Sequence, residues 1–336
     1  MRSHSAIRVA LLSKVQKVLE LQALSKHFPT HRAVDGVSFT IYSGEFFSLV
    51  GPSGCGKTTT LRLIAGFEEP TSGRLLLDGE SVEGLPAYKR NVSTVFQNYA
   101  LFPHLTVAQN VAFGLERRGK DNKQAVGEKV GKALALVHLD GKETRLPNQI
   151  SGGERQRVAL ARSLVLEPKV LLLDEPLSAL DAKLRKEMRQ ELKNLQRRTG
   201  VAFLFVTHDQ EEALSLSDRV AIMNRGVLEQ LGTPREVYRS PKTRFVAEFL
   251  GDVNWIDGAG VRPEALRVSR TTAPGVERCV SAIVEGQVFL GNCIHLSSRL
   301  ENGSICVAEM AQQDCDFEPG EPVYLCWHGQ DEFCAP

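Results

Sequence analysis

Eight consecutive residues have the composition and spacing of a phosphate-binding loop. They are Gly51, Pro52, Ser53, Gly54, Cys55, Gly56, Lys57 and Thr58, with Thr59 next in the chain. Glycines allow the backbone to bend so that successive N–H groups point inward at phosphate oxygens. The Lys57 ammonium then reaches the β- and γ-phosphates, and the Thr58 hydroxyl is a ligand for Mg²⁺. The loop therefore predicts a site for a nucleoside triphosphate with Mg²⁺.

The residues on both sides of this loop are those expected of a strand and a helix. The apolar run 46–50 precedes it, and the helix-prone run 59–65 follows it. The spacing G-x-x-x-x-G-K-[ST] should recur by chance in roughly one chain in a hundred of this length. A strand, a glycine-rich turn and a helix in this order make a chance match much rarer. The helix start also adds the positive end of its dipole.

Two adjacent carboxylates, Asp174 and Glu175, follow the apolar run 170–173. A near-continuous apolar run is typical of a strand inside a parallel sheet. Taken alone, the two acids are also compatible with a surface turn. Together with a phosphate loop, the first acid would complete the Mg²⁺ shell, and the second would act on water as a general base.

Weaker signals lie at the ends of other predicted elements. Gln97 and His208 each follow a short apolar strand, and Ser151, Gly152 and Gly153 open a helix whose free N–H groups form a second candidate anion site. A histidine after a strand is usually structural, and many helices begin with Ser-Gly. Phe28 is either a core residue or a ring that stacks on an adenine face. Residue types alone also leave burial and docking both open for the apolar stretch 98–107.

Composition limits the class of protein. The chain has 336 residues, of which 42% are apolar and 24% charged, as in an ordinary globular protein. Lys and Arg total 41 and Asp and Glu total 40, so no basic surplus indicates nucleic acid as a partner. The sequence contains no apolar run of membrane-spanning length. We interpret residues 1–17 as a short extension and not as a signal peptide.

Seven cysteines are present: Cys55 belongs to the phosphate loop, and the other six lie beyond residue 278. None of them forms a C-x-x-C pair, so the spacing gives little support for a zinc site. A disulfide framework conflicts with the reducing cytosol in which a nucleotide-binding domain is expected. We therefore expect reduced cysteines that pack as small apolar residues.

The distribution of strand-like and helical runs along the chain predicts two domains. Residues 18–250 alternate strand-like and helical runs, with helical character concentrated in about 86–149 and a last strand at 219–223. Short strand-like runs separated by Gly and Pro fill residues 251–336. We place the boundary near Gly251.

The ordered set of motifs resembles the ATPase subunit of an ABC transporter from about Val18 onward. The resemblance makes residues 51–58 the Walker A motif, which binds ATP. It also makes Gln97 the glutamine that senses Mg²⁺ and links the site to the membrane partner. Asp174 then corresponds to the Walker B aspartate that binds the metal, and Glu175 to the catalytic glutamate. The fold implied is an α/β P-loop NTPase with a helical subdomain, followed by a small all-β, TOBE-like domain.

The remaining motifs fit the same family. Ser151, Gly152 and Gly153 resemble the signature sequence, and Asp181 lies in a stretch similar to the D-loop. His208 matches the switch histidine, and Phe28 lies where the family has its adenine-stacking aromatic residue. The signature usually ends in Gln, whereas here it ends in Glu154. We expect that carboxylate to point away from the nucleotide or to pair, with Arg155 or Arg157 as candidate partners.

The resemblance also implies partners and a subfamily. In the family, two ATPase subunits enclose ATP between Walker A of one and the signature of the other. The stretch 98–107 resembles the segment with which importer ATPases receive a permease, and 261–264 resembles the opening of the small β domain. The chain is most similar to the spermidine/putrescine type. This implies a peripheral protein at the cytoplasmic face of the inner membrane, served indirectly by an external solute-binding protein. Importers of sulfate, ferric iron or sugar, a soluble ABC ATPase and a phosphotransferase remain alternatives.

Overall fold

The computed structural model describes residues 16–119, 121–272, 275–312 and 316–335. Most of the N-terminal extension expected at 1–17 lies outside these ranges. The chain divides into two compact units, one ending at Pro234 and the other beginning at Arg235. Residues 235–250, which the sequence analysis grouped with the first domain, belong to the second unit by their contacts. Within the described ranges, no helix is both long and apolar enough to span a membrane.

A six-stranded sheet forms the centre of the first unit, in the order β10-β9-β3-β8-β7-β6. Every pair from β9 to β6 is parallel, and β3 and β8 are buried at every position. The carboxyl ends of these strands therefore meet at one edge, where α/β proteins place ligands. The strands are β3 (Phe46–Val50), β6 (Val92–Val95), β7 (Val170–Asp174), β8 (Ala202–Thr207), β9 (Arg219–Asn224) and β10 (Val227–Gly232).

The expectation that 219–223 is the last strand of this unit was wrong. β10 follows β9 and pairs with it antiparallel through a tight turn at Arg225 and Gly226, both of which have positive φ. Two central residues with positive φ are typical of the turns that close β-hairpins. Polar residues such as Glu229 interrupt the apolar pattern of β10, as expected of a strand at the edge of a sheet.

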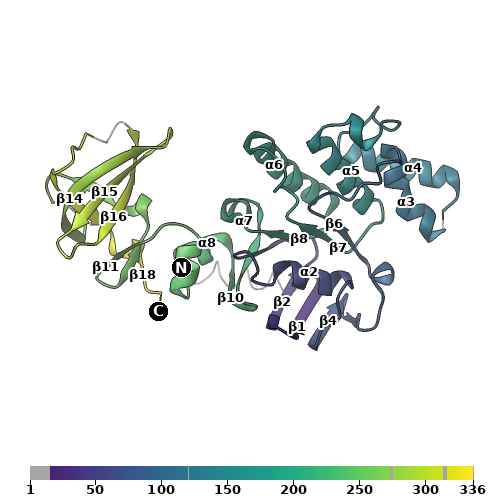
Figure 1. The fold of residues 1–336 in the computed structure, drawn as a ribbon, viewed down its shortest axis with the longest axis horizontal. Helices are drawn as coiled ribbons and strands as arrows, with labels where there is room; N and C mark the ends of the chain where they lie inside the picture. The colour runs from purple at the N-terminus through teal and green to yellow at the C-terminus, as the bar shows by residue number, and fades with distance from the viewer. Residues whose placement is uncertain (1–15, 120, 273–274, 313–315, 336) are drawn as a thin grey trace. The chain divides into compact units, whose positions relative to one another are not determined.

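An antiparallel sheet covers one side of helix α2 (Lys57–Ala65). Its order is β2-β1-β4-β5, and its strands are β1 (Lys17–Phe28), β2 (His31–Tyr42), β4 (Ser72–Leu77) and β5 (Glu80–Ser81). One apolar cluster joins this sheet, α2 and one face of the central sheet, with Leu61, Ile64 and Phe47 almost wholly buried. The helix that begins at the phosphate loop is thus packed between two sheets (Figure 1).

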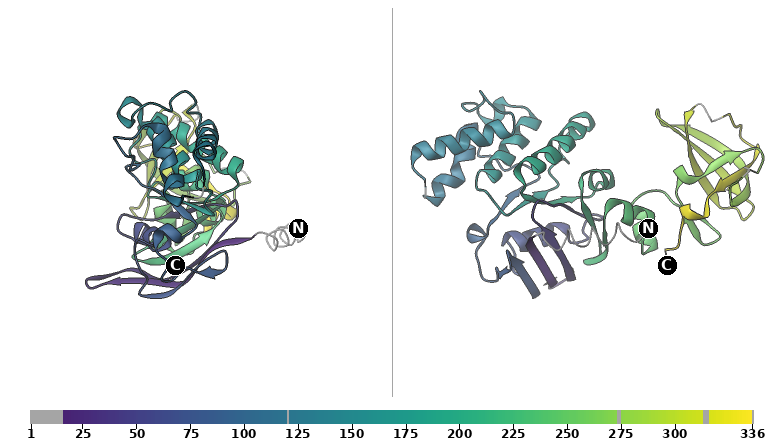
Figure 2. Two further views of the ribbon diagram at one scale, coloured as in Figure 1. Left: turned by 90° about the vertical axis from the view of Figure 1, so that its right-hand side faces the viewer. Right: turned by 180° about the vertical axis from the view of Figure 1, so that it is seen from behind.

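The other helices of the first unit share a second apolar cluster with the opposite face of the central sheet. Helices α3, α4 and α5 gather on one side, away from β1, β2 and β4 (Figures 1 and 2). The helices are α3 (Val107–Arg118), α4 (Lys123–Leu136), α5 (Gly152–Leu164), α6 (Ala182–Thr199) and α7 (Gln210–Leu216), with short 3₁₀ turns η1 (Ala87–Lys89) and η2 (Pro147–Gln149).

The second unit begins with two short helices and continues as β structure. A five-stranded antiparallel sheet has the order β13-β17-β14-β15-β16, and a three-stranded sheet has the order β11-β12-β18. The elements are α8 (Pro234–Arg239), α9 (Arg244–Phe249), β11 (Asn254–Ile256), β12 (Ala259–Val261), η3 (Pro263–Ala265), β13 (Arg267–Ser269), β14 (Arg278–Phe289), β15 (Ile294–Leu300), β16 (Ile305–Met310), β17 (Pro322–Trp327), η5 (Gly329–Asp331) and β18 (Glu332–Phe333).

The expectation that all cysteines are reduced was wrong for one pair. Cys279 in β14 lies directly opposite Cys326 in β17, with 4.1 Å between their Cα atoms, and the two form a disulfide. The register of two antiparallel strands brings these side chains together, and spacing along the chain does not reveal that register. Cys55, Cys293, Cys306 and Cys334 are free thiols.

Candidate nucleotide-hydrolysis site

The phosphate loop connects β3 to α2, and its shape depends on glycine. Gly56 has φ of +106°, and a Cβ at this position would lie 2.2 Å from the Ala33 carbonyl oxygen. A Cβ at Gly51 would lie equally close, 2.2 Å, to the Met223 carbonyl oxygen. Side chains at either position would collide with backbone, so β2 and β9 hold the loop closely from behind. The Gly226 N–H also donates to the Cys55 carbonyl oxygen at 3.0 Å.

Lys57 lies across the inside of this loop. Its ammonium donates to the carbonyl oxygens of Gly51 at 2.8 Å and Pro52 at 3.0 Å, and the residue is only 5% exposed. The neighbouring Cys55 thiol is buried, and burial raises its pKa, so it is neutral beside the lysine. The loop therefore presents one fixed positive charge, as phosphate binding requires.

Thr58 and Asp174 bring two oxygen ligands together from α2 and the end of β7. The Thr58 hydroxyl donates to Asp174 Oδ1 at 3.3 Å. Burial raises the pKa of Asp174, and the hydrogen bond from Thr58 opposes that rise. Mg²⁺ takes oxygen ligands and usually keeps several waters, so one hydroxyl and one carboxylate beside a phosphate loop fit this ion.

Glu175 and His208 meet at the ends of adjacent strands β7 and β8. His208 Nδ1 lies 3.1 Å from Glu175 Oε2, and the imidazole remains half-exposed. The Glu175 N–H donates to the Val206 carbonyl oxygen at 3.0 Å, and its φ of +45° lies in the left-handed region. Such a conformation costs a non-glycine residue of order 1 kcal/mol, and it persists where the surroundings impose it. The Glu175 carboxylate is therefore held in one place, beside the half-exposed His208 ring.

Gln97 is connected to this pair through Ser178, which the sequence analysis did not single out as a site residue. The Gln97 amide donates to Ser178 Oγ at 3.1 Å, and the Ser178 hydroxyl donates to the Glu175 carbonyl oxygen at 2.8 Å. The structure thus links Gln97 to the backbone of Glu175 and not to Asp174. Ser178 follows the acidic pair by three residues, and only the packed turn shows that its hydroxyl faces Gln97.

The signature residues lie at the start of α5, outside the group formed by residues 51–58, 174, 175 and 208. Ser151 caps the helix: its hydroxyl accepts from the Glu154 N–H at 3.2 Å. Asp181 caps α6 in the same way by accepting from the Leu184 N–H at 3.0 Å. Across the part of the chain that the structure describes, no hydrogen bond or ion pair joins the start of α5 to the phosphate loop.

Glu154 pairs with groups other than those suggested from the sequence. Its carboxylate accepts from the Ser151 N–H at 2.7 Å and lies 3.4 Å from the Lys142 ammonium. The Ser151 N–H holds the pKa of Glu154 below its usual value. The expected pairing with Arg155 or Arg157 was wrong, because Arg155 donates to the Ile150 carbonyl and Arg157 pairs with Glu191. The departure from Gln therefore keeps a complete capping box.

Phe28 ends β1 at the tip of the hairpin with β2. Its ring stacks on His31 with 5.3 Å between ring centroids, and the Lys26 ammonium lies 5.1 Å from its centroid. Phe28 is partly exposed, so the ring presents a free area near a cation. The adenine role assigned to it by resemblance stays a prediction.

Two polar side chains that the sequence analysis missed, one partly exposed and one buried, hold the stretch 98–107. The Arg162 guanidinium, on α5, donates to the carbonyl oxygens of Tyr99 and Ala100 at 2.7 Å each. Asn110, on α3, both donates to and accepts from the backbone of Phe102. Tyr99 is buried, whereas Pro103 and His104 are exposed, so the stretch is neither wholly core nor wholly surface.

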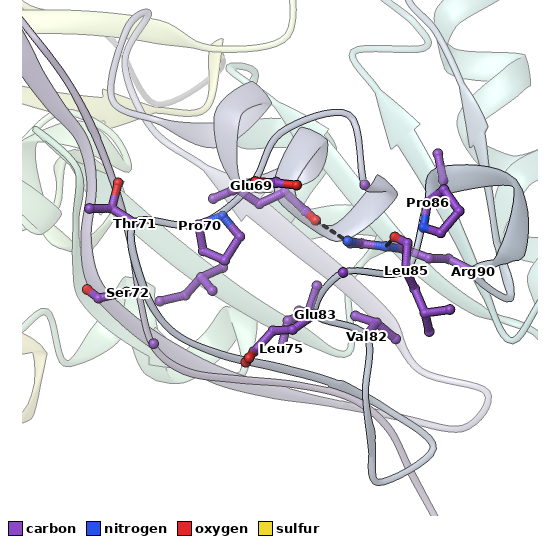
Figure 3. A pocket seen from close by; sticks show the side chains of 16 residues that line it. Glu69, Pro70, Thr71, Ser72, Leu75, Val82, Glu83, Leu85, Pro86 and Arg90 are labelled. Carbon is purple, nitrogen blue, oxygen red and sulfur yellow. Dashed lines mark hydrogen bonds between the residues drawn. The ribbon is translucent and has the colours of Figure 1, made fainter.

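A cavity of about 650 Å³ lies at the carboxyl end of α2. Arg90 closes that end by donating to the carbonyl oxygens of Leu63 at 2.6 Å and Ile64 at 3.0 Å. Figure 3 shows Pro70 and Thr71 on one side of the cavity, and Leu85, Pro86 and Arg90 on the other. Three exposed apolar residues lie on or next to its lining segments, and we call them the apolar rim: Phe67, Leu85 and Tyr88. Phe67 contacts Phe96, the residue before Gln97, with ring centroids 6.0 Å apart.

A phosphate loop, a hydroxyl–carboxylate pair that fits Mg²⁺ and a held carboxylate at one edge of a parallel sheet define a P-loop ATPase. The ABC transporter family model matches residues 34–178, and the TOBE domain model matches residues 259–333. The chain is 47% identical to the spermidine/putrescine import ATP-binding protein PotA of Rubrobacter xylanophilus, over 92% of this chain and 91% of that protein. It is 46% identical to the PotA protein of Bacillus cereus, over 95% of this chain and 99% of that protein.

Solved structures agree with this assignment. CbiO1 of Clostridium perfringens, part of the ABC transporter complex CbiONQ, is similar with a TM-score of 0.61 and 30% identity, over 66% of this chain and 90% of that chain. The ATP-binding cassette MJ0796, solved as a dimer with ADP and phosphate, gives a TM-score of 0.57 and 31% identity, over 65% of this chain and 99% of that chain. The chain therefore belongs to the ABC transporter family, as an ATP-hydrolysing subunit, and the predicted fold class is confirmed.

Proposed function

We propose that this chain powers the import of polyamines of the spermidine/putrescine type through a membrane permease. The observation that carries the proposal is identity of 45–47% to polyamine import ATP-binding proteins over nearly the whole length of both chains. The β-rich second unit supports it, because the similarity extends through the TOBE domain and not only through the ATPase core.

In the proposed hydrolysis step, Glu175 orients and polarises the water that attacks the γ-phosphate. His208, 3.1 Å from that carboxylate, fixes its orientation and contacts the γ-phosphate itself. Lys57 and the N–H groups of residues 51–58 hold the phosphates, and the Phe28 ring stacks on the adenine. Thr58 and Asp174 would hold Mg²⁺, which would supply positive charge for the phosphate oxygens, and the family role of Gln97 as a sensor of the ion is part of this proposal.

The working unit in this proposal contains two copies of the chain. Residues 151–153 form the start of α5, and in the described residues no hydrogen bond or ion pair joins them to the phosphate loop of the same chain. The N–H groups of Gly152 and Gly153 and the Ser151 hydroxyl fit the γ-phosphate held by a second copy, whereas the Ser151 N–H is already bonded to Glu154. Asp181, beside them in the contact between α5 and α6, would lie at the same junction.

The permease docks, in this proposal, on the apolar rim and the exposed part of 98–107. Phe67, Leu85 and Tyr88 are 52%, 37% and 82% exposed, an unusual grouping of large apolar side chains. The contact of Phe67 with Phe96 connects the surface to Gln97 and so to Glu175. Docking there would place the chain at the cytoplasmic face of the inner membrane, with an external solute-binding protein delivering the polyamine to the permease.

Uptake of labelled putrescine and spermidine tests the proposal. Cells would carry the wild-type chain, Glu175→Gln, or the matched control Glu187→Gln, which alters an exposed acid on α6. We expect polyamine uptake to be lost only with Glu175→Gln. If uptake of sulfate, ferric iron or maltose were lost instead, the chain would serve a different importer. Unchanged uptake of every solute, with a chain that membranes do not retain, would favour an ATPase without a transport role.

A further inference from the structure

Three side chains of the second unit converge on one face of its five-stranded sheet. Cys293 comes directly before β15, and His295 is two residues further on. Side chains two residues apart on a strand lie on the same face. Glu309 in β16 is the direct cross-strand partner of His295. Strand pairing therefore brings a thiol, an imidazole and a carboxylate together.

The distances between the donor atoms suit a metal ion. The Cys293 sulfur, a His295 ring nitrogen and a Glu309 carboxylate oxygen all lie within 4.8 Å of one another. His295 Nε2 and Glu309 Oε2 are 3.4 Å apart. Ligands of a tetrahedral zinc ion are separated by roughly 3.3–3.8 Å, as bond lengths of about 2.0–2.3 Å require. The distance between His295 and Glu309 already meets this spacing, and the 4.8 Å limit on the other two distances exceeds the upper value of that range by about 1 Å.

The three groups differ in exposure in a way that leaves one side open. Cys293 is 9% exposed, whereas the His295 and Glu309 side chains are 27% and 42% exposed. The sulfur thus lies at the buried end of the cluster, and the other two donors lie nearer to solvent. The turn before Cys293 is closed by a hydrogen bond from the Leu290 N–H to the Cys293 carbonyl, at 2.9 Å.

The donor set selects the kind of metal. Mg²⁺ and Ca²⁺ prefer oxygen ligands alone, so a thiol at the buried end disfavours both. Thiolate, imidazole and carboxylate together are the ligands of zinc, and three protein ligands leave a fourth position for water. We propose that Cys293, His295 and Glu309 bind Zn²⁺, which fastens the turn at residues 290–293 to β16. This site is independent of the nucleotide site and of the polyamine proposal.

Cobalt(II) substitution in the full-length chain tests this site. The probe is Co²⁺ added to the reduced, metal-free protein, because a thiolate–cobalt bond gives a charge-transfer band and tetrahedral coordination gives intense visible bands. We expect one equivalent to bind with both signals, and Zn²⁺ to displace it. Cys293→Ser should abolish the charge-transfer band. Glu309→Gln, which changes an exposed side chain, should weaken binding by more than about tenfold while circular dichroism stays unchanged.

Matched thiol controls separate this site from other cysteines. Cys334→Ser removes an exposed thiol, and Cys279→Ser removes one that reduction frees; both should keep the charge-transfer band. Cobalt at Thr58 and Asp174 has no sulfur ligand and cannot produce it. The proposal is overturned if wild-type protein gives no thiolate band, or if the band survives Cys293→Ser. It is also overturned if Glu309→Gln binds Co²⁺ as tightly as the wild type. Glu309 would then form only the ion pair with His295 and would not be a metal ligand.

Discussion

Glu175 combines a fixed backbone with a partly exposed carboxylate. Its N–H bond to Val206, its positive φ and its contact with His208 all restrict where the carboxylate lies. A group so restricted is suited to orient one water, and removing its charge should affect chemistry more than binding.

We expect Glu175→Gln to lower the rate of ATP hydrolysis by about 10²–10⁴-fold, the usual contribution of a general base. ATP affinity should change by less than threefold, since the phosphates are held by residues 51–58. Phosphate release and equilibrium nucleotide binding measure the two effects. Glu187→Gln should leave both unchanged. A variant that still hydrolyses ATP at half the normal rate would remove Glu175 from the proposed role.

Glu154 illustrates how a charge inside a capping motif acts on stability. Glu154→Ala removes the side-chain half of the capping box and should destabilise the chain by about 0.5–2 kcal/mol, whereas Glu154→Gln should be nearly neutral at pH 7. The Ser151 N–H keeps the pKa of Glu154 below its ordinary value of 4.5. The stabilisation is therefore fully present above that value and is lost as the pH falls through the lower, folded-state pKa.

Urea denaturation at pH 7 and near pH 4 checks this prediction. At the lower pH the wild type should lose more unfolding free energy than Glu154→Gln does, because only the wild type has a carboxylate at this position to protonate. A difference that does not change with pH would show that the carboxylate gains nothing from the Ser151 N–H.

At the scale of elements, Arg162 ties α5 to the stretch 98–107. Its two bonds of 2.7 Å hold the carbonyls of Tyr99 and Ala100, and both residues have positive φ. This stretch begins beside Gln97 and lies in the surface proposed for permease docking. Loosening it should therefore uncouple hydrolysis from transport.

Arg162→Met keeps the length of the side chain and removes both hydrogen bonds. We expect a loss of about 1–3 kcal/mol in unfolding free energy, because two carbonyl groups lose their partner. The fold-loss in polyamine uptake should be at least three times the fold-loss in ATP hydrolysis by the isolated chain. Arg118→Met is the matched control, since Arg118 donates to the single Leu166 carbonyl at 3.0 Å. Equal losses of uptake and hydrolysis in Arg162→Met would refute the coupling role.

The disulfide between β14 and β17 closes a loop over a separation of 47 residues. Oxidised protein should therefore lose about 2–4 kcal/mol of unfolding free energy for the second unit upon reduction, or in Cys279→Ser. Chemical denaturation followed by tryptophan fluorescence measures this loss, because Trp255 and Trp327 both lie in the second unit. Cys334→Ser, which removes an exposed free thiol, should change the value by less than about 0.5 kcal/mol. Insensitivity to reductant would mean that the two thiols are not joined in solution.

Local patterns predicted the elements that carry the chemistry. The phosphate loop, the buried strand before Asp174 and the capped start of α5 are each specified by consecutive residues. The disulfide, the bond between Gln97 and Ser178 and the contact of Glu154 with Lys142 depend on which distant segments meet, and a single sequence does not encode these pairings in a readable form. The bond between Glu154 and the Ser151 N–H is local, and the spacing of the capping box could have predicted it. The edge strand β10 was missed for a related reason, because alternating polar residues at an edge weaken the apolar signal.

At the scale of the whole molecule, the proposed function brings residues 151–153 to the nucleotide of a second chain. Glu175→Gln with ATP should therefore elute at the mass of a dimer, and with ADP at the mass of a monomer, when light scattering follows gel filtration. Adding Ser151→Arg to this variant should prevent dimerisation by placing a long side chain at the proposed junction. A chain that stays monomeric with ATP would mean that the permease is needed to assemble the pair, or that the signature assignment fails.

The Lys57 ammonium already has two carbonyl partners within its own loop. In the proposed nucleotide site, an incoming phosphate would therefore replace these carbonyl oxygens as the partner of the ammonium. Nucleotide binding would exchange the hydrogen bonds of Lys57 to carbonyls for bonds to phosphate. The free energy gained from Lys57 is then the difference between bonds to a charged phosphate and bonds to neutral carbonyls. The carbonyls of Gly51 and Pro52 thus compete with phosphate for the Lys57 ammonium. In the proposed site they would weaken the binding of ADP after hydrolysis.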